Sequence, residues 1–135
     1  MSGVGLDLLD IARLERSLER RPRLAERLFT DAERSYAAAR ARPGQHLAAR
    51  FCAKEAVAKA LRLEAWRWRD IEVVGRDEGI AIALHGALAG LADDVQISLT
   101  HSRGMAGAVA VIADDFVVGR DRVAGRPHRG AEGAS

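Results

Sequence analysis

Two carboxylates and a lysine have the chemistry to act together on a phosphate-bearing substrate. Asp7 follows Gly5 near the end of a short apolar run, where a carboxylate is costly unless it is paired or binds a metal. Glu55 and Lys59 are four residues apart and so share a helix face. Mg²⁺ prefers one or two carboxylates with substrate phosphate oxygens and water, and an ammonium neutralises phosphate charge. The pattern fits a magnesium site at Asp7 and Glu55 beside Lys59, although a helix-capping Asp7 and a surface Glu55–Lys59 ion pair are the commoner explanations.

Lysine is scarce in this chain. Of 21 basic residues only Lys54 and Lys59 are lysines, and they flank Glu55. One explanation is chance in an arginine-rich composition. The other is that the segment 54–59 needs the compact ammonium group of lysine rather than the guanidinium of arginine. Arg50 and Lys54 are also four residues apart and share a neighbouring helix face. Three roles are open for them: contacts to phosphate, contacts to a partner, or solvated surface charge.

Hydroxyl groups and an imidazole close a predicted strand and open a turn before Gly104. Such groups at a strand end can hold phosphate oxygens, and the alternative is a polar turn with an exposed histidine. The residues are Ser98, Thr100, His101 and Ser102.

Arginines recur at helical spacing near the N-terminus, at positions 13, 16 and 20. Residues 8–27 hold six arginines against four acidic residues, a local charge of +2. This pattern is typical of a solvated, salt-bridged helix or of a docking face for an acidic protein. RNA is a weaker candidate, because aromatic residues make up 4% of the chain and none lies among these arginines.

Hydrophobic periodicity and turn signals predict the elements that position these residues. Asp10 is a predicted N-cap, Thr30 and Glu33 form a capping box, and Pro43-Gly44 is expected to break the helical region. The expected strands cover 3–9, 71–74, 80–84, 95–100 and 106–113. The expected helices run from Ile11 and over 22–28, 31–40, 45–61 and about 87–93. This order predicts an α+β fold with a largely antiparallel sheet packed against helices.

Composition predicts one cytoplasmic domain. The 135 residues are 48% apolar, carry a net charge of +2 and include a single cysteine, Cys52, so no internal disulfide framework is expected. No signal peptide, transmembrane helix or nucleotide-binding glycine motif is evident. We expect one domain over residues 1–118 and a disordered basic tail over 119–135.

Together, in this order, the motifs resemble the holo-[acyl-carrier-protein] synthases, the short class of 4′-phosphopantetheinyl transferases. The resemblance covers about residues 3–113, and its most specific part is the Lys-Glu-Ala-x-x-Lys helix. The motifs are Gly3-Val-Gly-Leu-Asp7 with Arg13, Leu28-Phe-Thr-Asp-Ala-Glu33, Ala49-Arg-Phe-Cys-Ala-Lys-Glu-Ala-Val-Ala-Lys-Ala60 and Ile97-Ser-Leu-Thr-His-Ser102.

The resemblance implies a reaction, in which the phosphopantetheine arm of coenzyme A passes to a serine of an apo acyl carrier protein and adenosine 3′,5′-bisphosphate is released. Asp7 and Glu55 would hold Mg²⁺ at the pyrophosphate, and Lys59 would contact the attacked phosphate. Glu55 and a water on the metal are both candidate bases for the serine proton. The implied coenzyme A contacts are Lys59, Arg50, Ser98, Thr100, His101 and Ser102, and the implied carrier-protein contacts are Arg13, Arg16, Arg20 and Arg50.

The resemblance also implies a homotrimer with each site at a subunit junction, because longer members hold two such halves in one chain. Neither nucleic acid nor membrane is an expected partner. Two rival hypotheses remain, an inactive relative that only binds carrier proteins and a small basic RNA-binding domain.

Overall fold

The computed structural model describes residues 2–76 and 79–113, so the predicted tail over 119–135 lies outside the described residues. Within these ranges a first strand is followed by a run of helices and then by the remaining strands, and two single-turn 3₁₀ segments, Trp68–Asp70 and Gly86–Leu88, flank the β2–β3 hairpin. The strands are β1 (Gly3–Asp10), β2 (Ile71–Arg76), β3 (Gly79–Leu84), β4 (Gln96–Ser102) and β5 (Met105–Ile112). The helices are α1 (Ile11–Arg20), α2 (Leu24–Leu28), α3 (Asp31–Ala38) and α4 (Pro43–Ala60).

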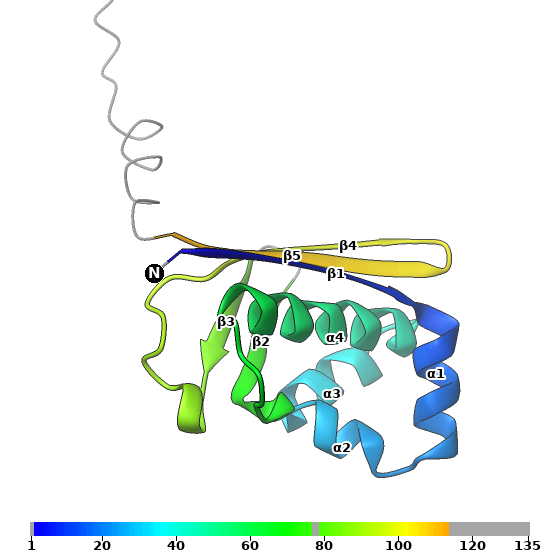
Figure 1. Cartoon of the computed structure of the whole chain (residues 1–135). Coiled ribbons are helices and arrows are strands. Elements are labelled where there is room, and N and C mark those ends of the chain that lie inside the picture. The colour runs from blue at the N-terminus through cyan, green and yellow to red at the C-terminus, as the bar shows by residue number, and fades with distance from the viewer. Residues whose placement is uncertain (1, 77–78, 114–135) are drawn as a thin grey trace, which may run out of the picture.

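The strands form two antiparallel sheets, which confirms the predicted α+β class. β5 lies between β1 and β4 in a three-stranded sheet, and β2 pairs with β3 as a hairpin. Figure 1 shows α4 running beneath the three-stranded sheet, with α2 and α3 farther below and α1 at one end. Its buried side chains, including Cys52, Ala53, Ala56 and Val57, make α4 the centre of the core.

Alternation along β1 decides which side chains meet α4. Gly5 and Asp7 belong to the inner face, whereas Leu6 and Leu8 are exposed on the outer face. A Cβ atom at Gly3 or Gly5 would overlap the backbone carbonyl oxygen of Ala60 or Ala56, respectively. The glycines therefore let β1 approach the backbone of α4 closely, which brings Asp7 near the helix.

Side-chain caps set the starts of two helices, as predicted. The carboxylate of Asp10 accepts a hydrogen bond from the backbone N–H of Arg13 at 3.2 Å. Thr30 and Glu33 form the reciprocal capping box at the start of α3. Because Asp10 caps α1, the alternative interpretation of Asp7 as a helix cap is wrong.

Two predicted helix boundaries need correction. Pro43 occupies the first turn of α4 rather than the break before it, because proline lacks only an N–H that a first turn leaves unpaired. The predicted helix near 87–93 is reduced to the 3₁₀ turn Gly86–Leu88, and Gly90 after it has a φ of +76°. Glycine in that left-handed conformation does not extend a helix.

Lys54 is a core residue, and its interpretation as a phosphate contact, partner contact or solvated charge is wrong. Its ammonium pairs with Glu33 at 2.7 Å, and both side chains are 0% exposed. It also donates to the backbone carbonyls of Trp68 and Ile71 at 2.9 and 2.6 Å. Burial lowers the pKa of Lys54, and the nearby Glu33 opposes that effect. A buried pair with its hydrogen bonds satisfied ties α3, α4 and β2 together.

Candidate functional site

Asp7 and Lys59 meet where β1 crosses α4. The ammonium of Lys59 lies 3.3 Å from Oδ1 of Asp7 and donates to the backbone carbonyl of Leu6 at 2.9 Å. The side chain of Lys59 is 52% exposed and that of Asp7 is 18% exposed, so solvent and a substrate can reach the pair. The lysine predicted to meet phosphate is thus paired with the aspartate of β1.

Glu55 completes this group from one turn earlier on α4. It is partly buried, and burial followed by the negative charge of Asp7 raises its pKa, while Lys59 opposes the shift. A partly buried carboxylate beside a second negative charge is stabilised in its ionised form by a nearby cation. The structure brings Asp7, Glu55 and Lys59 together as the sequence analysis expected.

Cys52 lies directly beneath the carboxylates. Burial and the charge and hydrogen bonding of Asp7 raise the pKa of its thiol to about 12, so the thiol is neutral near pH 7. It donates to the backbone carbonyl of Ala106 at 3.6 Å. A neutral, buried thiol is a poor nucleophile and metal ligand, so Cys52 is a packing residue under the site.

The donor set fits a hard cation that also binds substrate oxygens. Among residues 2–76 and 79–113, no three His, Cys, Asp or Glu side chains gather into a metal-holding set. Asp7 and Glu55 alone offer two carboxylates, and Mg²⁺ commonly takes one or two together with phosphate oxygens and water. Burial, followed by the negative charge of Asp7, disfavours the ionised form of Glu55, and a bound cation would offset both effects.

A second group lines a cavity of about 460 Å³ beside the first turns of α4. His101 lies at its edge, with Nε2 2.9 Å from Nε2 of Gln45. The cavity is lined by Tyr36, His46, Ala49, Arg50, Gly79, Ile80, Ile97, Ser98, Leu99 and His101. Its basic and polar lining is suited to an anionic ligand.

The strand register separates the predicted polar residues of β4. His101 pairs with buried Ala106 and so shares the inner face with α4. Ser98, Thr100 and Ser102 alternate with it and belong to the outer face of the sheet. The structure therefore does not bring all four side chains to one face within a single chain, although Ser98 lines the cavity with His101.

The four arginines predicted to contact the carrier protein do not share one surface. Arg13, Arg16 and Arg20 are exposed along α1. Arg50 is 4% exposed in α4, so its predicted place on the same docking face is not supported. Its guanidinium carbon lies 4.0 Å from the ring centroid of Tyr36 instead.

Two lining residues of this cavity, Tyr36 and His46, were not predicted from the sequence, and neither was Gln45, which hydrogen-bonds His101. The available signal was helical spacing, since His46 and Arg50 are four residues apart, as are Tyr36 and Arg40. The packing of α3 against α4 brings these pairs together. Local sequence patterns do not predict that packing.

Comparisons with known proteins point to one family. Residues 3–116 match the family model described as the 4′-phosphopantetheinyl transferase superfamily. The chain is 44% identical over 124 residues to the holo-[acyl-carrier-protein] synthase of Moorella thermoacetica, covering 86% of this chain and 97% of that protein.

Solved structures agree in fold. An ACPS–CoA complex from Chronobacterium ammoniagenes matches with a TM-score of 0.72 at 28% identity, covering 83% of this chain and 96% of that one. The acyl carrier protein synthase of Mycobacterium tuberculosis matches with a TM-score of 0.66 at 36% identity, covering 82% and 96% of the two chains. Across the described ranges of the present chain, no helix combines the length and apolar character needed to cross a membrane.

Proposed function

The chain belongs to the 4′-phosphopantetheinyl transferase superfamily, among the holo-[acyl-carrier-protein] synthases, and on that premise we propose a Mg²⁺-dependent transfer of the 4′-phosphopantetheine group of coenzyme A to a serine of an apo acyl carrier protein. The observation that carries this proposal is the meeting of Asp7, Glu55 and Lys59 between β1 and α4. Coenzyme A as the donor is supported by the CoA complex of the related Chronobacterium ammoniagenes structure.

The transfer exchanges the phosphoanhydride bond of the pyrophosphate for a phosphoester bond to serine. The serine oxygen bonds to the pantetheine-linked phosphorus, the bond from that phosphorus to the bridging pyrophosphate oxygen breaks, and adenosine 3′,5′-bisphosphate leaves. The serine proton passes to a base. Most catalysis in such transfers comes from positioning and from neutralising charge on the phosphoryl oxygens.

Lys59 is placed to neutralise that charge. Leu6 and Asp7 engage two of its three N–H donors, and among the described residues the third has no recorded acceptor. That donor can reach a phosphate oxygen of the substrate. A Mg²⁺ held by Asp7 and Glu55 would supply further charge neutralisation at the pyrophosphate.

Glu55 is our candidate base for the serine proton. Its carboxylate lies beside Asp7 and Lys59, where the serine would meet the attacked phosphate, and a carboxylate within hydrogen-bond reach can accept the serine proton. The partial exposure of Glu55 leaves it accessible to an incoming serine.

The cavity at the start of α4 is our candidate site for the nucleotide end of coenzyme A. Arg50 and His101 supply cationic and hydrogen-bonding groups there. Ser98, Thr100 and Ser102 remain candidate contacts, and we propose that they serve a site shared between subunits because they belong to the outer face of the sheet.

The uncovered face of the three-stranded sheet supports the homotrimer that we propose. Val4, Leu6 and Leu8 are 67%, 60% and 63% exposed along β1. An exposed apolar row of this kind marks an interaction surface, and we assign a second copy of the chain as its occupant.

The exposed Arg13, Arg16 and Arg20 form our candidate docking face for the acidic carrier protein. A cytoplasmic setting suits the single free thiol of the described residues, Cys52. Neither nucleic acid nor membrane is proposed as a partner.

Replacement of either carboxylate tests the proposal. We expect Asp7→Ala and Glu55→Ala each to lower the transfer rate by roughly two to three orders of magnitude. Each carboxylate would help to hold the Mg²⁺ that neutralises the phosphate charge. Transfer is followed by the mass of the carrier, and circular dichroism checks the fold. Asp93→Ala removes an exposed carboxylate outside the site and should transfer normally. Near-wild-type rates in both site variants would refute the assignment.

A further inference from the structure

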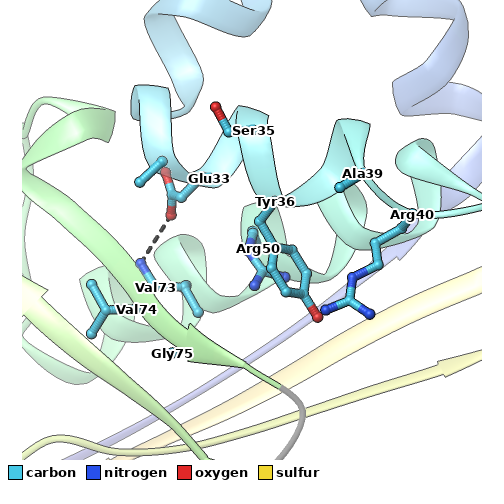
Figure 2. Close-up of a pocket in the computed structure, with 10 residues that line it drawn as sticks. Glu33, Ser35, Tyr36, Ala39, Arg40, Arg50, Val73, Val74 and Gly75 are labelled. Atoms are coloured by element: carbon cyan, nitrogen blue, oxygen red, sulfur yellow. Dashed lines mark hydrogen bonds between the residues drawn. The ribbon is translucent and has the colours of Figure 1, made fainter.

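Tyr36 lies at a junction of cationic side chains between α3 and α4. The guanidinium carbon of Arg50 is 4.0 Å from the centroid of its ring, and that of Arg40 is 4.5 Å away. The imidazole of His46 meets the same ring edge-on, with centroids 5.6 Å apart and planes at 80°. Figure 2 shows Tyr36 between the two arginines at the wall of a cavity.

This ring lines two neighbouring cavities. One, of about 570 Å³, lies between α3 and the end of β2, and the other is the 460 Å³ cavity that His101 borders. Tyr36 and Arg50 line both of them. The Arg50 guanidinium therefore contributes positive charge to the walls of both cavities.

Arg50 needs a specific environment to hold that position. Its side chain is 4% exposed, and a desolvated guanidinium is stabilised by the negative face of an aromatic ring. A planar guanidinium also stacks on a ring in a way that the ammonium of lysine does not reproduce. An arginine already fixed before binding loses less side-chain freedom when it meets a phosphate group.

We propose that Tyr36 is a positioning residue for coenzyme A, and that its ring fixes the guanidinium of Arg50 at the cavity where the phosphate groups of the substrate bind. This inference rests on the proposed function, because that function places the nucleotide end of coenzyme A in the cavity. Tyr36 acts through Arg50 and takes no part in the transfer. The aromatic face, rather than the phenolic hydroxyl, is the working feature.

Substitutions at Tyr36 separate the ring from the hydroxyl. Tyr36→Leu should raise the KM for coenzyme A roughly five- to thirtyfold, the range expected from loss of a partly desolvated cation–π contact. The kcat should stay within about twofold, and the KM for the carrier protein should not change. Tyr36→Phe keeps the ring and should retain the wild-type KM for coenzyme A. A Phe variant as impaired as the Leu variant would overturn the role of the ring.

A double-substitution cycle tests whether Tyr36 acts through Arg50. Arg50→Gln should raise the KM for coenzyme A, and adding Tyr36→Leu to it should raise that KM no further. Fully additive effects, or a fall in kcat at unchanged KM, would overturn the proposal. If Tyr36→Leu does not fold, Arg50→Lys keeps the charge without the stacking plane and should raise the KM in its place. A wild-type KM in folded Arg50→Lys would count against the proposal.

Calorimetric titration of the same proteins with coenzyme A separates this inference from the proposed function. If wild-type protein binds coenzyme A but transfers nothing to any carrier, the proposed function fails. The Tyr36 proposal is then still judged by the dissociation constants. Equal dissociation constants for wild-type and Tyr36→Leu protein would overturn it whatever the activity.

Discussion

At the scale of single residues, the surroundings of Glu55 disfavour its ionised form. It is partly buried beside Asp7, and burial and the Asp7 charge raise its pKa. The raised pKa means that ionised Glu55 is less favourable in the folded chain than in the unfolded one. That penalty is present at neutral pH and vanishes where both states are protonated, below the ordinary value of about 4.5.

Glu55→Gln should therefore stabilise the protein in EDTA at pH 7. We expect a rise in melting temperature of roughly 1–3 °C, small because Glu55 is partly exposed to solvent. Near pH 4 the difference should shrink toward zero. Thermal melts at the two pH values measure it, with Glu64→Gln as a control at an exposed position. A lower melting temperature for Glu55→Gln at pH 7 would contradict this electrostatic description.

Residue types and spacing predicted the meeting of Asp7, Glu55 and Lys59, but not the separate fates of the two lysines. Lys54 and Lys59 are five residues apart, which places them about 140° apart around the helix. Lys54 faces Glu33 in the core, and Lys59 faces Asp7 at the surface. Only the packing of α3 and β1 on opposite sides of α4 distinguishes them, and local sequence does not encode that packing.

At the scale of elements, the close approach of β1 to α4 is the feature that assembles the site. Strand and helix were predictable because their periodicity and caps are local. The overlap that a side chain at Gly3 or Gly5 would cause with α4 was not, because it depends on how the two elements cross.

Gly5→Ala should destabilise the fold and separate Asp7 from Lys59. The added Cβ would overlap the carbonyl of Ala56, so we expect a loss of about 1–3 kcal/mol in the free energy of unfolding. Urea denaturation measures this loss, and transfer activity should fall with it. Gly104→Ala is the matched control, since nothing lies within 4 Å of a Cβ there. Equal stability of the two variants would argue against the close-approach role.

At the scale of the whole molecule, the two faces of the three-stranded sheet have different environments. The inner face packs on α4 (Figure 1). The outer face carries the exposed apolar row of β1. Alternation in the sequence predicts two faces, but it does not say which one another subunit covers. The family resemblance implies a trimer. The exposed apolar row of β1 gives a physical reason for it, because a second copy of the chain would remove that row from water.

Leu6→Asp should disrupt the proposed trimer. Light scattering should give the wild-type protein a mass of three times 14.6 kDa and the variant a mass closer to 14.6 kDa. The trimer of the variant would bury a charge in an apolar contact, which is costly. Leu91→Asp, which alters a 41% exposed leucine away from the sheet, should leave the mass unchanged. A monomeric wild-type protein would refute the assembly.

Charge reversal on α1 tests the docking face. Arg13→Glu should raise the KM for the carrier protein by about tenfold while the KM for coenzyme A stays constant, and the effect should shrink as salt is added. Steady-state kinetics at two ionic strengths give both values. Arg67→Glu reverses an exposed charge in the connector after α4 and serves as the control. Equal changes in both KM values would count against a docking role for Arg13.

Intact mass spectrometry of an acyl carrier protein measures the proposed transfer itself. The protein is mixed with apo carrier, coenzyme A and Mg²⁺, with a parallel sample in EDTA. We expect the carrier to gain the mass of one phosphopantetheine group and EDTA to abolish the gain. A carrier that stays apo with folded enzyme, across fatty acid, polyketide and peptide synthase carriers, would contradict it.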